Sequence, residues 1–148
     1  MKPIYTLLLA ILVLTACQPQ TPEVTHYQSA EMESMNLPFS EAVIVGNMIY
    51  LSGQIGNKPG EMKVVEGGIE AETRQTLDNI KRVLEANGSS MEHAIKLTVM
   101  MDNMEEWPAM NEVYKTYFPG NKPARSAFGA TALALGAKLE IECIAIIP

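Results

Sequence analysis

The sequence predicts an α+β domain in which one mixed β-sheet carries two helices on a single face. Three observations support this fold class. Segments with the two-residue alternation of strands flank two segments with the periodicity of amphipathic helices. The predicted order is β-β-α-β-α-β-β, which favours one sheet with both helices on the same side. The length of 148 residues suits a single domain with a hydrophobic core.

The first two predicted strands are Ala42–Val45 and Met48–Gly53. Between them lies Gly46-Asn47, a two-residue hairpin signal in which the usual Asn-Gly order is reversed. A loop over residues 56–68 then leads to the first predicted helix.

That helix, Ile69–Asn87, has one apolar face and one charged face, and Gly88 ends it. The apolar face consists of Ile69, Thr73, Thr76, Leu77, Ile80, Val83 and Leu84. The opposite face carries Glu72, Arg74, Asp78, Lys81, Arg82 and Glu85. We interpret this second face as solvated surface rather than a binding site.

A third strand is predicted over His93–Met101, and Asp102 or Asn103 then caps a second helix that runs to Phe118. Pro108 is compatible with this helix because it falls near the first turn. The inner stripe of the helix consists of Trp107, Met110, Val113, Tyr114, Tyr117 and Phe118. We interpret this aromatic stripe as core rather than as a cofactor site.

The last predicted strand alternates clearly over residues 138–147. One face is uniformly apolar and contains Leu139, Ile141, Cys143, Ala145 and Ile147. The other face carries Glu140 and Glu142, followed by Ile144 and Ile146. A half-apolar second face predicts a strand covered on both sides, and oligomerisation is the simplest way to supply that cover.

The N-terminus reads as a signal peptide over residues 1–16, with Lys2, a short apolar stretch and small residues before Cys17. The apolar stretch is too short for a membrane-spanning helix. Its ending, Leu14-Thr15-Ala16-Cys17, resembles a bacterial lipobox, in which Cys17 carries lipid. The alternative is an ordinary signal peptide that contains a cysteine near its end. Residues 17–35 are predicted to be the lipidated cysteine and a flexible tether, because they are polar, proline-containing and aperiodic.

Resemblance to sorted bacterial lipoproteins implies a lipid-anchored protein of the cell envelope, on the outer membrane and facing the periplasm. Lipid on Cys17 would leave Cys143 as the remaining thiol, on the apolar face of its strand, where it is expected to act as a small buried hydrophobe.

Charge and histidine placement exclude two classes of function. The formal net charge is −6 and becomes −7 once Lys2 is removed with the leader, so the chain lacks the basic footprint of a nucleic-acid-binding protein. His26 and His93 are isolated from each other and from cysteine, so no metal site is predicted.

The most informative pair of residues is Arg125 and Glu140. Arg125 lies in Pro123-Ala124-Arg125-Ser126, a short loop upstream of the strand that carries Glu140. A guanidinium group matches a carboxylate bidentately, so the pair predicts a site for a small carboxylate. The alternative is a structural salt bridge between the two side chains.

The residues around this pair resemble the closing segment of the RidA/YjgF family of imine deaminases. The matching motifs are Pro123–Ser126 with Leu139–Ala145, and upstream Gly46–Ile55, Glu72–Ile80 and Met110–Tyr114. The resemblance covers a RidA-like domain over residues 36–148. It implies a homotrimer of the chorismate-mutase-like fold, with active clefts at the subunit boundaries.

The resemblance also implies a reaction: cofactor-free hydrolysis of a 2-imino acid to the 2-keto acid and ammonia. Arg125 matches the family's carboxylate-binding arginine, and Glu140 matches the carboxylate that positions the attacking water. Ser52 and Gly53 fall where the family lines its pocket, and Asn111 would reach the pocket from the second helix. The alternative for Ser52 and Asn111 is a local hydrogen bond to the backbone.

Two positions depart from the family pattern. Phe39 stands where many imine-deaminating relatives carry tyrosine, and Ala127 replaces a cysteine that is common after Arg-Ser. These changes leave the predicted carboxylate-binding arginine in place, but they remove side-chain groups from the part of the site that would position the attacking water. They motivate an alternative function, a non-catalytic trimeric module in the cell envelope that binds a small carboxylate or a protein. Ribonuclease activity, described for some relatives, fits the acidic charge poorly.

Overall fold

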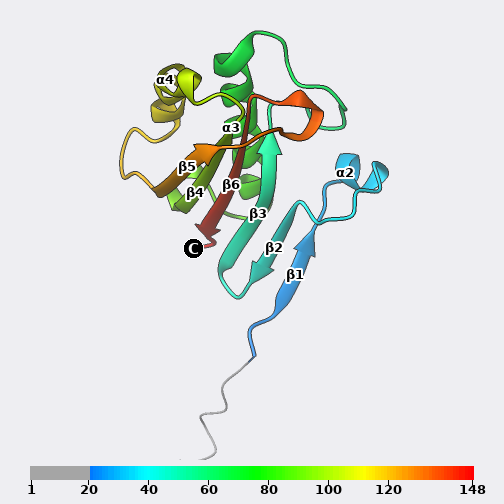
Figure 1. Ribbon diagram of the computed structural model, residues 1–148. Helices are drawn as coiled ribbons and strands as arrows, with labels where there is room; N and C mark the ends of the chain where they lie inside the picture. The colour runs from blue at the N-terminus through cyan, green and yellow to red at the C-terminus, as the bar shows by residue number, and fades with distance from the viewer. Residues whose placement is uncertain (1–20) are drawn as a thin grey trace, which may run out of the picture.

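The computed structural model describes residues 21–148, in which a six-stranded sheet carries the helices α3 and α4 on one side (Figure 1). The strands are β1 Val24–Tyr27, β2 Ala42–Val45, β3 Met48–Ile55, β4 Ala94–Met101, β5 Ala124–Gly129 and β6 Leu139–Ile146. Their order in the sheet is β1-β2-β3-β6-β4-β5. Only β4 and β5 pair in parallel, and the other neighbours are antiparallel. The predicted α+β fold with a mixed sheet is confirmed.

The N-terminal boundary requires a correction, because part of the predicted tether over residues 17–35 belongs to the fold. β1 pairs with β2, and a short helix α2, Ala30–Ser34, follows it. The backbone amide of Ser29 also donates to Glu41 Oε2 at 3.1 Å, and Glu41 is 1% exposed. These contacts are made with residues distant in sequence, so the aperiodic segment gave no local signal of them. The predicted signal peptide and Cys17 lie outside the described residues.

Helix α3, Gly68–Ala86, buries the predicted apolar face against the sheet, and Gly88 follows its end with a φ of +76°. Its charged face is not wholly solvated, which corrects the sequence-based interpretation. Glu72 is only 4% exposed, and Arg82 forms an ion pair with Glu41. Gly56 approaches the backbone of Glu72 so closely that an added Cβ would lie 2.7 Å from its Cα. The β3–α3 loop and the start of β2 therefore cover this side of the helix.

Helix α4, Trp107–Tyr117, follows a short 3₁₀ turn, Met104–Glu106. Asn103 was predicted to cap this helix and instead caps the 3₁₀ turn before it: the Asn103 side chain accepts a hydrogen bond from the amide of Glu105 at 3.0 Å. The predicted inner stripe is largely buried, with Met110, Val113, Tyr114 and Phe118 all in the interior. The stripe is part of the core, as expected.

The strand register separates two faces of the sheet, because residues paired across strands point the same way. The face under the helices contains the buried side chains of Leu51, Cys143 and Leu97. The opposite face is open in the single chain and includes Tyr50 and Phe128, which are 42% and 50% exposed. The half-apolar second face expected for β6 is thus present across several strands.

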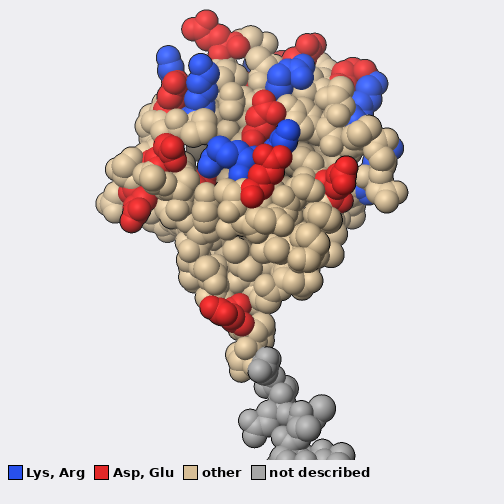
Figure 2. All heavy atoms as spheres, turned by 180° about the vertical axis from the view of Figure 1, so that it is seen from behind, with Lys and Arg blue, Asp and Glu red and all other residues tan. Residues whose placement is uncertain are grey.

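The side of the molecule seen in Figure 2 carries acidic and basic residues interspersed over its upper half, with few charges below. Within α3, the charged side chains of Lys81 and Glu85 pair at 3.8 Å. This side has no continuous basic surface of the kind that follows a nucleic-acid backbone. None of the helices within residues 21–148 is both long and apolar enough to cross a membrane.

Candidate active site

Arg125 lies on β5 and is held by side chains of α4. Its Nη1 donates to Asn111 Oδ1 at 2.8 Å. The guanidinium carbon lies 4.9 Å from the ring centroid of Trp107 and 4.5 Å from that of Tyr114, within the range of cation–π attraction. Among the described residues, Asn111 is the one hydrogen-bond partner of this guanidinium, so further N–H donors remain for a ligand. The sequence placed Asn111 on the second helix and Arg125 near the last strand, and the structure brings these two side chains together.

Tyr114 adds a neutral hydroxyl beside this arginine. Burial raises the pKa of Tyr114 to about 12, although the positive charge of Arg125 acts in the opposite direction. The hydroxyl is buried and has no hydrogen-bond partner among the described residues. Tyr114 therefore stays protonated near neutral pH and holds an unused donor, a feature that the sequence, read as a core stripe, did not indicate.

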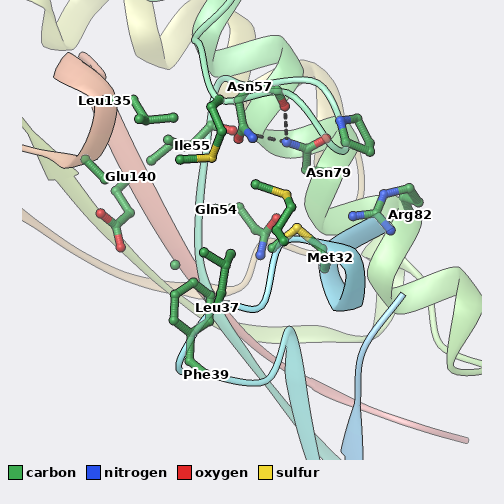
Figure 3. Close-up of a pocket in the computed structure, with 15 residues that line it drawn as sticks. Met32, Leu37, Phe39, Gln54, Ile55, Asn57, Asn79, Arg82, Leu135 and Glu140 are labelled. Atoms are coloured by element: carbon green, nitrogen blue, oxygen red, sulfur yellow. Dashed lines mark hydrogen bonds between the residues drawn. The ribbon is translucent and has the colours of Figure 1, made fainter. Parts of the chain in front are cut away.

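Glu140 lies on β6 and lines a cavity of about 290 Å³ (Figure 3). Its carboxylate makes no hydrogen bond or salt bridge to another described residue. Burial raises the pKa of Glu140, and the neighbouring charge of Glu142 raises it further. Gly53 lies directly against this side chain, since a Cβ at residue 53 would overlap the carboxylate. A half-buried carboxylate with a raised pKa is suited to proton transfer.

One chain does not bring Arg125 and Glu140 together. Arg125 is in register with Leu97 on the helix side of the sheet, whereas Glu140 is in register with Met100 and, through it, Phe128. Met100 and Phe128 lie three positions beyond Leu97 and Arg125 on their strands. Because side chains alternate along a strand, Glu140 and its neighbours Met100 and Phe128 point to the open face. The structural salt bridge considered from the sequence is not formed within the described chain. The two halves of the predicted site lie on opposite faces of one sheet.

The other predicted residues divide between these halves. Phe39 and Gly53 line the cavity with Glu140. Ala127 is in register with Val99 and packs against the core on the helix side of the sheet, the side on which Arg125 also lies. Ser52 donates its hydroxyl to the carbonyl of Ser40 at 2.7 Å, a backbone hydrogen bond to a residue of a distant segment and not the local one considered from the sequence.

The described residues hold no cluster of three or more histidine, cysteine or carboxylate side chains that could bind a metal ion. Cys143 is buried, and burial raises the pKa of its thiol to about 12. Its expected behaviour as a buried hydrophobe is confirmed.

The chain is similar in sequence to known proteins. A family model described as Endoribonuclease L-PSP matches residues 30–147. The 2-iminobutanoate/2-iminopropanoate deaminase of Rattus norvegicus is 43% identical over 108 residues, which are 73% of this chain and 79% of the relative. The protein of the same name from Homo sapiens is 41% identical over 109 residues, 74% of this chain and 80% of the relative.

The chain belongs to the RidA/YjgF family.

Solved structures of RidA/YjgF proteins share the fold. A Rid-family protein from Yersinia pestis, YyfA, superposes with a TM-score of 0.78 at 35% identity, covering 84% of this chain and 99% of that one. RidA from the Antarctic bacterium Psychrobacter sp. PAMC 21119 gives a TM-score of 0.72 at 34% identity, covering 87% and 100%. The resemblance read from four motifs therefore extends over the whole fold.

Several cavity residues of this RidA/YjgF chain were missed by sequence reasoning. Met32 of α2 and Met35 directly after it were assigned to the tether, Arg82 to a solvated face, and Leu135 to no element. Figure 3 shows Glu140 on one side of the cavity and Met32 and Arg82 on the other, with Gln54 between them. The one sequence signal for this part of the cavity was Phe39, which the family resemblance had placed in the site.

Proposed function

We propose that this chain is a RidA-type imine deaminase that hydrolyses 2-imino acids to 2-keto acids and ammonia without a cofactor. The observation that carries the proposal is Glu140, a half-buried carboxylate with a raised pKa and no partner among the described residues, in a cavity. It occurs in a chain 41–43% identical to proteins named 2-iminobutanoate/2-iminopropanoate deaminase.

The complete site is proposed to form between two copies of the chain in a homotrimer. One copy supplies Arg125 with Asn111, and the next supplies Glu140, Gly53 and Phe39. The opposite-facing placement of Arg125 and Glu140 in one chain supports this arrangement, because a site that uses both residues needs a second copy. The exposed apolar side chains of the open sheet face offer a surface for that contact.

In the proposed mechanism each group has one role. Arg125 binds the substrate carboxylate, and the free N–H donors of its guanidinium suit a bidentate contact. Ionised Glu140 accepts a proton from water as the water oxygen bonds to the carbon of the protonated imine, whose C=N π electrons pass to nitrogen, giving a neutral tetrahedral aminoalcohol. The protonated carboxyl then gives its proton to nitrogen. The C–N bond breaks with its electron pair leaving on ammonia, and the C=O bond forms as Glu140 takes up the hydroxyl proton.

A turnover assay tests this mechanism with imine generated in place by an amino-acid oxidase. Arg125→Ala and Glu140→Gln are each expected to lower kcat/KM by at least 100-fold while the protein remains folded. Rates equal to wild type for either variant would contradict the assigned roles.

Mixing the two variants tests the shared site directly. Arg125→Ala and Glu140→Gln chains are unfolded, mixed in equal amounts and refolded. In random trimers, roughly a quarter of the interfaces would then combine an intact Arg125 with an intact Glu140. We expect activity to return to about that fraction of wild type. If refolded trimers contain both chains and remain inactive, the two residues do not act across an interface.

A second candidate function is a non-catalytic module that binds a small carboxylate or a protein. Phe39 and Ala127 favour it, because the hydroxyl and thiol that many relatives carry at these positions are missing. Calorimetry with 2-ketobutyrate, run beside the turnover assay, separates the two functions. Binding with no turnover of any imine would favour the module.

We also propose that lipid on Cys17 anchors the protein in the cell envelope, on the outer membrane facing the periplasm. The motif Leu14-Thr15-Ala16-Cys17 supports this proposal. Incorporation of labelled fatty acid into the wild type, lost in Cys17→Ser, is the expected result. Equal labelling of both proteins, or of neither, would contradict it.

A further inference from the structure

The cavity beside Glu140 extends well beyond the space that a small imine needs. Its volume of about 290 Å³ corresponds to about ten water-sized volumes, at roughly 30 Å³ each. An imine with a methyl or ethyl side chain would leave most of this space filled with water. The part of the cavity away from Glu140 therefore calls for a separate explanation.

The additional wall of this cavity is apolar. It is formed by Met32 of α2, Met35 directly after that helix, Leu37, Phe39, Met62 of the β3–α3 loop and Leu135. Phe39 contributes a ring without a hydroxyl at this wall. Methionine side chains are flexible and polarizable, so they adapt to apolar groups of different shape.

The polar groups of the cavity are mostly engaged in the fold. Asn79 donates to the carbonyls of Ile55 and Asn57 at 3.1 and 2.8 Å, and Figure 3 shows these bonds at the cavity edge. Asn57 Nδ2 in turn donates to the carbonyl of Glu61 at 2.9 Å. The guanidinium of Arg82 pairs with Glu41. These bonds leave apolar contact as the main interaction that the far part of the cavity offers.

Leu135 gives a second, independent observation. It has a φ of +55°, in the left-handed region that a non-glycine residue seldom adopts, and it is 42% exposed. Such backbone strain persists where the surrounding structure requires it, often at ligand clamps. Here it places a large apolar side chain among the lining residues, on the side of Glu140, with Met32 of α2 on the other side of the cavity (Figure 3).

We propose that this apolar cavity binds the substrate side chain, so that the preferred substrates are 2-imino acids with long apolar side chains, such as those derived from leucine, methionine and phenylalanine. The inference rests on the proposed deaminase function and adds the substrate class. Each methylene buried in the cavity is worth about fourfold in kcat/KM. The leucine-derived imine is therefore expected to exceed the alanine-derived imine by at least tenfold.

An amino-acid oxidase supplies both imines in place, and the loss of each is followed against the uncatalysed rate. A tenfold or greater preference for the leucine-derived imine supports the inference. Equal kcat/KM values, or a preference for the alanine-derived imine, overturn it and leave the deaminase function standing. If neither imine is hydrolysed, both the deaminase function and the inference fail.

Two variants locate the preference in the cavity. Met32→Asp places a charge in the α2 wall and is expected to lower the ratio of kcat/KM for the leucine-derived imine to kcat/KM for the alanine-derived imine by at least tenfold. Ser34→Asp adds the same charge to an exposed position of the same helix and is the matched control. Leu135→Asn removes the apolar side chain from the opposite wall, and asparagine tolerates the left-handed backbone well, so the fold is preserved. Unchanged preference in both folded cavity variants would overturn the inference.

Discussion

Replacing Gly53 by alanine tests whether the position of the Glu140 carboxylate controls the reaction. A Cβ at residue 53 would lie 2.7 Å from Cδ and 2.9 Å from Cγ of Glu140. Carbon atoms in ordinary contact are about 3.5–4.0 Å apart, so the carboxyl group would have to move by roughly 1 Å. Misplacing a catalytic group by that distance costs about 100-fold in rate. We therefore expect kcat/KM for the imine assay to fall about 100-fold in Gly53→Ala.

Gly53→Ala should keep its fold, because the displaced atoms belong to the end of a half-buried side chain that can rotate. Its free energy of unfolding in urea is expected within about 1 kcal/mol of wild type. Gly56→Ala is the structural counterpart: its Cβ would meet the backbone of Glu72 at 2.7 Å, and it should lose about 1–3 kcal/mol of stability. Gly120→Ala meets nothing within 4 Å and should match wild type in both assays.

The reasoning fails if folded Gly53→Ala retains wild-type kcat/KM, because Glu140 would then tolerate the displacement. It also fails if activity falls only in proportion to the unfolded fraction measured in the same buffer. Circular dichroism on the assayed sample distinguishes that outcome from a true loss of rate.

Three further predictions concern buried groups. Burial raises the pKa of Glu72, although its carboxylate accepts a hydrogen bond from the Lys138 amide. The ionised side chain therefore destabilises the fold at pH values above its ordinary pKa of 4.5. Glu72→Gln should raise the free energy of unfolding in urea at pH 7, and this gain should vanish as the pH falls below 4.5. Arg82→Met leaves Glu41 buried without its partner and should cost about 3–5 kcal/mol in the same measurement, most of it recovered by adding Glu41→Gln. The Cys143 thiol, with a pKa of about 12, should resist iodoacetamide at pH 8 until urea unfolds the chain, and rapid labelling of the native protein would contradict its burial.

The parts of the fold that the sequence predicted are those with a local signal. Helix α3 was predicted within a residue at each end, because its apolar spacing and Gly88 are properties of one continuous segment. The hairpin at Gly46 was predicted for the same reason, and Gly46 has the positive φ that its turn requires. β1 was missed because a short strand with mostly exposed side chains is defined by its partner β2, and that pairing leaves no periodicity in the segment itself.

The motifs named candidate site residues and carried no information on their geometry. Arg125 and Glu140 were identified from motifs, and they lie on opposite faces of one sheet. Their faces depend on how β5 and β6 are registered against β4, and register is set by contacts between distant segments. The burial of Glu72 and the pairing of Arg82 with Glu41 escaped prediction for the same reason, because the covering segments come from elsewhere in the chain.

The two departures from the family pattern make Glu140 the centre of proton transfer in the proposed mechanism. Of the residues that line the cavity, only Arg82 and Glu140 are ionisable, and Arg82 is engaged in an ion pair with Glu41. Phe39 cannot share a proton with the water, so one carboxylate must both accept the water proton and return it to nitrogen. A single group does both steps best when its pKa lies close to the working pH. Burial and the charge of Glu142 raise the pKa of Glu140 and so move it toward the working pH, which partly offsets the hydroxyl that Phe39 lacks.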